Sequence, residues 1–201
     1  DAIREPTKMF GFFYWAGAAK SVDTEPVLMT LEIAAAPTAL ANPVRVNPLP
    51  WQIKEFGIDK IWQRTMGEGV KIAILDTGVN TEHPDLRGAM VWGKNYLTDG
   101  SPQNTADLDG HGSMAASVAL GRGTSANGAV GVAPAASLMV GRVLKGRLSE
   151  VEVRFVIQAI RDAVANQAAI ISISLGTVDF LRNELRQAIR DAVLQNVIVV
   201  A

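Results

Sequence analysis

VKIAILDTG, residues 70–78, joins an almost entirely apolar run to a short polar turn. A run rich in Ile, Val and Leu, without alternation of polar and apolar positions, predicts a strand that is buried on both faces. Three later segments have the same character: SLMVGRVL (137–144), AIISIS (169–174) and NVIVVA (196–201). We therefore expect a set of buried strands in the part of the chain that begins at Val70.

Two amphipathic patterns separate the last three of these runs. SEVE (149–152) has the form of a capping box, and apolar residues then fall on one helical face: Val153, Val156, Ile157, Ile160 and Val164. A second helix follows AIISIS and has an inner face of Leu181, Leu185, Ile189, Ala192 and Val193. Strands that alternate with such helices are joined by right-handed βαβ crossovers. The pattern predicts an α/β fold, with a parallel sheet covered by helices on both faces.

Asp76, Thr77 and Gly78 follow directly after the first predicted strand. Ligands and chemistry gather at the carboxyl ends of the strands in such a sheet, so Asp76 is a candidate functional residue. Two other interpretations fit the same residues. Asp76 can simply cap a turn, and Asp-Thr-Gly is also the signature of aspartic proteases. That class needs two carboxylates sharing a proton, whereas this chain contains one copy of the motif in an α/β setting.

DLDGHGSMAASVALG, residues 107–121, places His111 at the start of a helix of small residues, which can pack closely on a sheet. His111 is the second candidate functional residue, although a histidine in this position can also cap the helix. Asp107 and Asp109 fit a solvated turn. With His111 they are also a candidate metal site, but no second histidine lies at ligand spacing. The other histidine, His83, is expected in a turn.

Composition restricts the partners of the protein. The chain has 201 residues, of which 48% are hydrophobic and 19% charged, enough for one domain with a core and an appendage. A net charge of −1 gives no basic excess that would attract nucleic acid or an anionic membrane, so we expect neither as a partner. The absence of cysteine excludes disulfides, thiolate catalysis and cysteine-built zinc sites.

The part of the chain before residue 51 differs from the rest. NPVRVNPLP (42–50) contains three prolines, which exclude a helix or a central strand, so we expect a leading segment over residues 1–46 and the α/β domain over residues 47–201. MFGFFYWAGAA (9–19) has about half of the ~20 residues that a membrane span needs. We expect a buried strand or hairpin there, with the apolar core of a secretion signal as the alternative.

Four segments together resemble the subtilisin-like serine proteases. ILDTGVNTEHPDL (74–86) is similar to the aspartate motif of that family and GHGSMAASVALG (110–121) to its histidine motif; GVAPAASLMVGRVL (131–144) and ISISLGT (171–177) follow in the family's order. The resemblance covers residues 51–201, about three quarters of the chain. Met114 stands where the family often has a second histidine, and Ser113 replaces its usual threonine. The implied fold is a three-layer parallel sheet with helices on both faces, incomplete at the C-terminus.

The resemblance implies a serine endopeptidase that acts on peptide or protein substrates through a Ser-His-Asp triad, a chemistry that needs no cofactor. His111 would be the general base, and Asp76 would hold its tautomer. The substrate would pair as an added strand with Ser174, Leu175 and Gly176, and residues near Gly146 and Leu148 would line its other side. A structural calcium ion is also implied, with Asp85 as a ligand helped by carbonyls of residues 124–129, and so is a secreted or periplasmic location.

Ser125, in GRGTSANG (121–128), is not expected to be the nucleophile. A helix from His111 to about Leu120 would carry the chain roughly 13 Å away, at ~1.5 Å per residue. A nucleophile must lie ~2.6–3.2 Å from its base. The family's nucleophile belongs to a Gly-Thr-Ser motif beyond the last motif found here. We therefore expect a missing C-terminal part to supply the serine, and residues 1–201 alone to be inactive.

The alternative function comes from a different class, a non-catalytic peptide-binding or regulatory module with the same fold. The presence of both Asp76 and His111 favours the enzyme, because such a module needs neither side chain. The leading segment, residues 1–46, is interpreted as the tail of an inhibitory propeptide or as an accessory segment.

Overall fold

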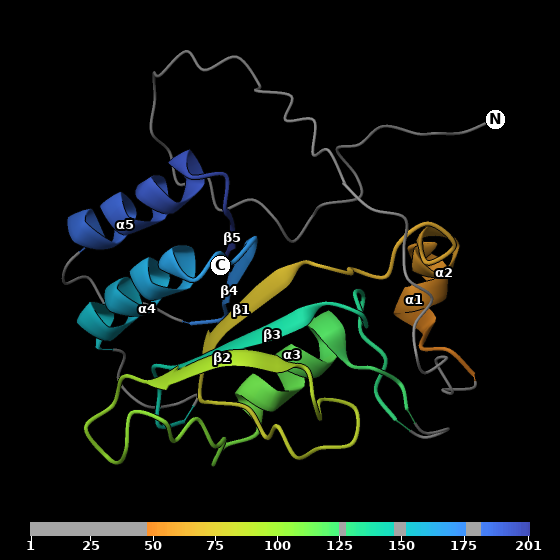
Figure 1. Cartoon of the computed structure of the whole chain (residues 1–201), viewed down its shortest axis with the longest axis horizontal. Helices are drawn as coiled ribbons and strands as arrows, with labels where there is room; N and C mark the ends of the chain where they lie inside the picture. The colour runs from red at the N-terminus through yellow and green to blue at the C-terminus, as the bar shows by residue number, and fades with distance from the viewer. Residues whose placement is uncertain (1–47, 125–127, 147–151, 176–181) are drawn as a thin grey trace.

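A computed structural model describes residues 48–124, 128–146, 152–175 and 182–201. Its centre is a five-stranded sheet in the order β2-β3-β1-β4-β5, in which every neighbouring pair is parallel (Figure 1). The strands are β1 (Lys71–Asp76), β2 (Met90–Asn95), β3 (Ser137–Arg142), β4 (Ile170–Ile173) and β5 (Ile198–Val200). The four strands expected from the apolar runs are confirmed. β2 was not expected, since it is a partly exposed edge strand with Gly93 and Lys94 inside it.

Helices cover both faces of the sheet, which confirms the expected three layers. α3 (His111–Leu120) lies on one face, and α4 (Val153–Ala165) and α5 (Arg182–Leu194) lie on the other (Figure 1). Two short helices, α1 (Trp51–Glu55) and α2 (Ile58–Ile61), precede β1. α1 begins directly after Pro50, which occupies its N-cap position. The expected leading segment and most of the proline-rich run lie outside the described residues.

The central strand β1 packs against both helical layers. Its side chains alternate, so that Ala73 and Leu75 join the core beneath α4 and α5, whereas Ile72 and Ile74 join the core beneath α3. All four side chains are at most 5% exposed. This double burial explains why the first strand shows a continuous apolar run and not an alternating one.

Two details of the helices differ from the sequence analysis. α4 begins at Val153, and Glu152 occupies the N-cap position with no side-chain capping bond, so Glu152 is not at the N3 position that a capping box requires. Ser149 lies outside the described residues. On α5, Val193 is 54% exposed and Ala188 is buried, which corrects the predicted inner face; Leu181 of that face lies outside the described residues. The helical period explains the difference, because a residue next to Ala192 is turned by about 100° away from the core.

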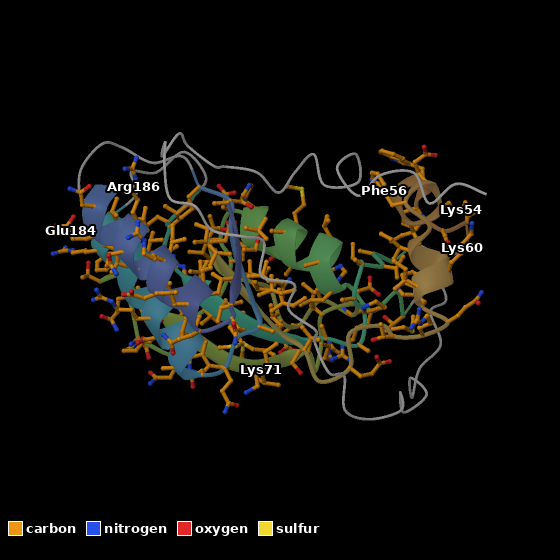
Figure 2. All side chains as sticks on the ribbon, turned by 90° about the horizontal axis from the view of Figure 1, so that it is seen from above. Lys54, Phe56, Lys60, Lys71, Glu184 and Arg186 are labelled. Carbon is orange, nitrogen blue, oxygen red and sulfur yellow. The ribbon has the colours of Figure 1, made fainter. Side chains whose placement is uncertain are left out.

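Charged side chains lie on the outside of both ends of the molecule. Figure 2 shows Lys54 and Lys60 projecting from α1 and α2, with Glu184 and Arg186 on α5 at the opposite end. Among the helices of the described ranges, none has the length and hydropathy that a membrane crossing requires.

Candidate active site

The carboxyl edge of the sheet brings Asp76 and His111 into direct contact. Asp76 is the last residue of β1, and His111 is the first residue of α3. The Nδ1 atom of His111 lies 2.8 Å from Oδ1 and 2.9 Å from Oδ2 of Asp76. The Asp76 side chain is 1% exposed and that of His111 is 22% exposed. Because Nδ1 donates to a carboxylate, the neutral ring carries its lone pair on Nε2, where it can accept a proton.

Thr77 and Asp107 hold the first turn of α3 against the end of β1. The Asp107 carboxylate accepts hydrogen bonds from the Thr77 hydroxyl, from three backbone N–H groups and from the Ser113 hydroxyl. Thr77 in turn accepts the Gly112 N–H, and its own N–H donates to Asp76. The free N–H groups of a helix N-terminus need such partners. Asp107 therefore acts as the cap of the helix that presents His111.

Two glycines allow close packing at the carboxyl end of β1. A Cβ atom on Gly112 would lie 2.1 Å from the carbonyl oxygen of Gly78, so a side chain there would push α3 away from the end of β1. Gly78 has φ of +106°, and a Cβ there would lie 2.5 Å from the carbonyl oxygen of Thr105, so a side chain would displace the segment that leads to α3. The Gly after His111 is thus explained by the contact between Asp76 and His111, and the Gly of Asp-Thr-Gly by the turn that follows Asp76.

The described substrate-binding candidates lie just after the two strands that flank β1. Leu75 pairs with Ile173 on β4, so Ser174 and Leu175 leave β4 at the level of Asp76. On the other side, β3 ends at Arg142, and Val143 and Leu144 donate their N–H groups to the Asp76 carbonyl. Gly146 follows and lies against the Asp109 carboxylate. The other two predicted residues, Gly176 and Leu148, lie outside the described residues.

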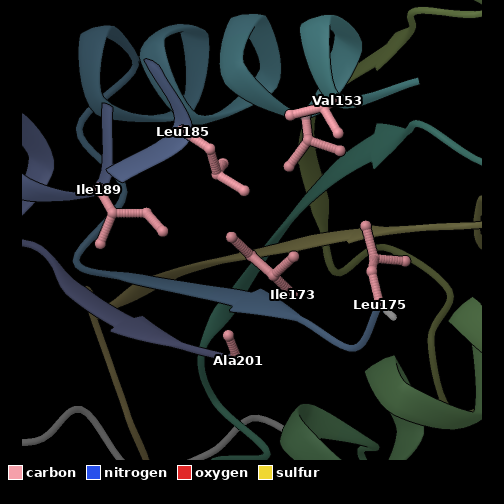
Figure 3. Close-up of a pocket in the computed structure, with 7 residues that line it drawn as sticks. Val153, Ile173, Leu175, Leu185, Ile189 and Ala201 are labelled. Carbon is pink, nitrogen blue, oxygen red and sulfur yellow. The ribbon is translucent and has the colours of Figure 1, made fainter. Parts of the chain in front are cut away.

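An apolar pocket adjoins the end of β4 (Figure 3). It lies between α4, α5 and the ends of β4 and β5, and its lining residues are Val153, Val156, Ile173, Leu175, Leu185, Ile189 and Ala201. Figure 3 shows Ile173 pointing into the pocket from β4 and Leu175 from the segment after β4, with Leu185 and Ile189 facing them from α5. All seven side chains are apolar, so the pocket offers packing surface and no reactive group.

A family model described as the subtilase family matches residues 67–201, a range that contains the whole sheet, Asp76 and His111. The chain belongs to the subtilase family. It is 37% identical to the major intracellular serine protease of Bacillus subtilis (strain 168) over 158 residues, which cover 77% of the chain and 49% of that protein. It is also 37% identical to thermitase of Thermoactinomyces vulgaris over 155 residues, 74% of the chain and 53% of that protein.

A solved subtilase-like structure has the same fold. The nisin leader peptidase NisP from Lactococcus lactis matches with a TM-score of 0.58 and 25% identity, covering 70% of this chain and 45% of that one. This subtilase chain thus spans about half the length of the relatives that it matches. The aspartic protease interpretation of Asp-Thr-Gly is excluded by the family.

Residues 107–111 do not form the metal site that Asp107 and Asp109 suggested. Within the described ranges, no group of three His, Asp or Glu side chains could hold a metal ion, which does not support the site of Asp107, Asp109 and His111. His83 lies in a turn, as expected, where its Nδ1 accepts the Asp85 N–H at 3.2 Å. The capping role of Asp107 was not predicted from the sequence. The N-cap residue of α3 is Gly110, so Asp107 lies three residues before the position at which a capping side chain is usually found.

We expect Asp107→Asn to lower the free energy of unfolding of this subtilase by about 1–3 kcal/mol, because the amide nitrogen cannot accept the hydrogen bonds that a carboxylate oxygen accepts and the helix N-terminus loses a negative charge. Thermal unfolding of the wild type and the variant at neutral pH measures the loss. Glu55→Gln, a matched change at an exposed carboxylate on α1, should leave the unfolding temperature unchanged.

The pH dependence of that difference identifies the Asp107 charge as its cause. Burial alone would raise the pKa of Asp107, but the hydrogen bonds from Ser113, Gly110 and Thr77 outweigh it and hold the pKa below its ordinary value. The stabilisation is therefore complete above the ordinary carboxylate pKa of about 4 and is lost as the pH falls through the lowered folded-state pKa. The difference between wild type and variant should shrink over that acidic range. A difference that stays constant there would contradict the capping charge.

Asp85 anchors the segment that follows α3. Its side chain is 1% exposed and accepts hydrogen bonds from the Thr124 N–H and hydroxyl and from the Ala129 N–H, at 2.7–2.9 Å. Burial would raise the pKa of Asp85, but these hydrogen bonds, with a smaller effect of His83, hold it below the ordinary value. Calcium binds through oxygen lone pairs, whereas the described neighbours of Asp85 aim N–H and O–H hydrogens at both of its oxygens. These contacts do not fit a calcium ligand, and calcium binding by Asp85 stays a prediction.

We expect Asp85→Ala to lower the free energy of unfolding by about 3 kcal/mol, because two backbone N–H groups and a hydroxyl lose their acceptor. Chemical denaturation measures this loss. The same variant tests the cation: the hydrogen bonds alone predict no effect of added calcium on the unfolding temperature of the wild type. A rise in the wild type that is absent from the variant would instead establish Asp85 as a calcium ligand.

Proposed function

We propose that the complete protein is a serine endopeptidase that cleaves peptide bonds through a Ser-His-Asp triad, with Asp76 and His111 as two of its three members. The observation that carries the proposal is the contact of the buried Asp76 carboxylate with Nδ1 of His111 at the carboxyl edge of the sheet. The family and the serine proteases among its relatives support the same activity.

His111 is the general base in this proposal. Its Nε2 removes the proton of the nucleophilic hydroxyl and later delivers it to the leaving amine, while Asp76 fixes the tautomer and stabilises the imidazolium. The hydrogen bonds of Thr77, Asp107 and Gly112 hold the first turn of α3 beside Asp76, and Asp76 itself orients the ring. Triad chemistry needs no metal or organic cofactor.

The nucleophile is proposed to come from sequence that residues 1–201 do not contain. In the described part of the chain, no hydrogen bond joins a serine hydroxyl to the imidazole; the Ser113 hydroxyl, on the same helix turn, donates to Asp107 and accepts the Asn80 N–H. A substrate peptide would lie as an added strand between the segments that begin at Ser174 and at Val143, with Gly176, Gly146 and Leu148 beside it.

The coding sequence after Ala201 and an assay of the complete protein test the proposal. We expect a Gly-Thr-Ser motif downstream, and hydrolysis of a fluorogenic protein substrate that a serine-directed fluorophosphonate abolishes. Absence of the motif, together with binding of peptides without hydrolysis, would instead favour the non-catalytic module with this fold.

A further inference from the structure

A buried arginine lies beside Asp76 at the carboxyl edge of the sheet. Arg142 is the last residue of β3 and is in register with Asp76 on β1 and with Asn95 on β2. Val140 and Leu138, two and four positions earlier, belong to the core beneath α3, so Arg142 lies on the same face of the sheet as His111. Arg142 is 2% exposed. A permanent cation is thus buried next to the candidate triad.

Asp99 is the partner of this cation. The guanidinium of Arg142 binds the Asp99 carboxylate in a bidentate arrangement, at 2.8 Å and 3.1 Å. The hydrogen bond from Arg142 lowers the pKa of Asp99. Asp99 lies in a bend, and its side chain is 28% exposed. The Arg142 Nε atom has no hydrogen-bond partner among the described residues. The buried positive charge of Arg142 is therefore neutralised by the Asp99 carboxylate, which belongs to a surface segment.

We propose that Asp99 is a positioning residue of the candidate active site, because it holds Arg142 in a neutral pair and so keeps that cation from competing with His111 for the Asp76 carboxylate. This inference rests on the proposed roles of Asp76 and His111. Neighbouring parallel strands are about 4.8 Å apart, a distance that an arginine side chain can span. A carboxylate such as that of Asp76 also forms stronger hydrogen bonds with an arginine that binds it in a bidentate arrangement than with a neutral imidazole.

Few other charges surround the Asp76–His111 pair. Asp107 and Asp109 precede α3, and Lys145 is an exposed residue after β3. α3 itself carries no charged residue other than His111, and β4 carries none. Lys94 of β2 binds Asp162 of α4, which lies on the opposite face of the sheet. Among the cationic side chains that the structure describes, Arg142 is thus the one placed to reach Asp76 once Asp99 is removed.

The test combines Asp99→Ala with a second change that removes the cation. In the complete protein, Asp99→Ala should lower kcat roughly tenfold or more with little change in KM, and should move the titration midpoint of the His111 ring protons to lower pH by about one unit, because a nearby cation disfavours the imidazolium. The double variant Asp99→Ala with Arg142→Met should restore both values toward the wild type. Relief of a buried unpaired charge could also restore a merely structural defect, so the His111 midpoint is the readout that separates the two roles: a merely structural role of Asp99 would leave that midpoint unchanged in the folded single variant.

Proton NMR follows the His111 ring without any need for activity, and His83, 46% exposed and distant in sequence, serves as an internal reference. The two failures are therefore distinguishable: absence of hydrolysis in the wild type contradicts the proposed function, while an unchanged His111 midpoint in Asp99→Ala overturns the role of Asp99. A double variant as impaired as the single one also overturns it. If Asp99→Ala does not fold, Asp99→Asn, which keeps an acceptor oxygen without the charge, takes its place in the comparison.

Discussion

In the complete protein, His111→Ala and Asp76→Asn should each lower kcat by several orders of magnitude, on the order of 10⁴-fold, with a much smaller change in KM. His111→Ala removes the general base. Asp76→Asn keeps the shape of the side chain, but its amide can donate to Nδ1, which favours the tautomer whose proton is on Nε2 and so blocks proton acceptance there. Steady-state hydrolysis of a fluorogenic peptide measures both effects.

His83→Ala provides the matched control, since it removes the other histidine of the chain. His83 is half-exposed and lies in a turn, where its side chain accepts the Asp85 N–H, so kcat should stay within a few-fold of the wild type. The double variant of Asp76 and His111 should be hardly worse than either single variant, because the two residues act as a unit. Near-normal kcat in Asp76→Asn would mean that the contact of 2.8 Å serves only the fold.

The sequence contained enough information for the sheet and for the contact between the two candidate catalytic residues. Continuous apolar runs identified β1, β3, β4 and β5, because strands buried on both faces have no polar alternation. The start of α3 at His111 followed from the small residues after it. Parallel topology placed the end of β1 and the start of that helix at the same edge, and the resemblance to the subtilisin-like proteases implied that Asp76 and His111 meet there.

What the sequence did not predict depends on contacts between distant segments. β2 was not predicted, because a partly exposed edge strand lacks the continuous apolar pattern of the buried strands. The pairing of Arg142 with Asp99 joins a strand end to a bend 43 positions earlier, and no local pattern encodes it. The position of Asp107 placed it near His111. Whether its oxygens face a metal, the solvent or the helix N-terminus depends on packing against a distant segment, because Thr77, directly after β1, donates to it. Periodicity predicts elements, whereas the polar contacts follow from their packing.

The chain of residues 1–201, produced alone, should neither hydrolyse peptides nor react with a serine-directed fluorophosphonate. Fluorophosphonates label hydroxyls that a base activates, which requires contact between the two groups. Ser125 itself lies outside the described residues, but its neighbour Thr124 is fixed to Asp85, whose carbonyl accepts the Arg122 N–H just beyond the end of α3. His111 begins that helix, and ten residues at ~1.5 Å each place the two ends roughly 13 Å apart.

Ser125→Ala in the complete protein therefore has the opposite expected result to the triad variants: kcat and the rate of fluorophosphonate labelling should remain near those of the wild type. Mass spectrometry of labelled protein shows which serine carries the adduct, and in the complete protein we expect it beyond residue 201. Stoichiometric labelling of Ser125 in the 201-residue chain would overturn this assignment. Since α3 lies between His111 and the described Thr124, that result would also require the helix to unfold or to lie elsewhere when the serine reacts.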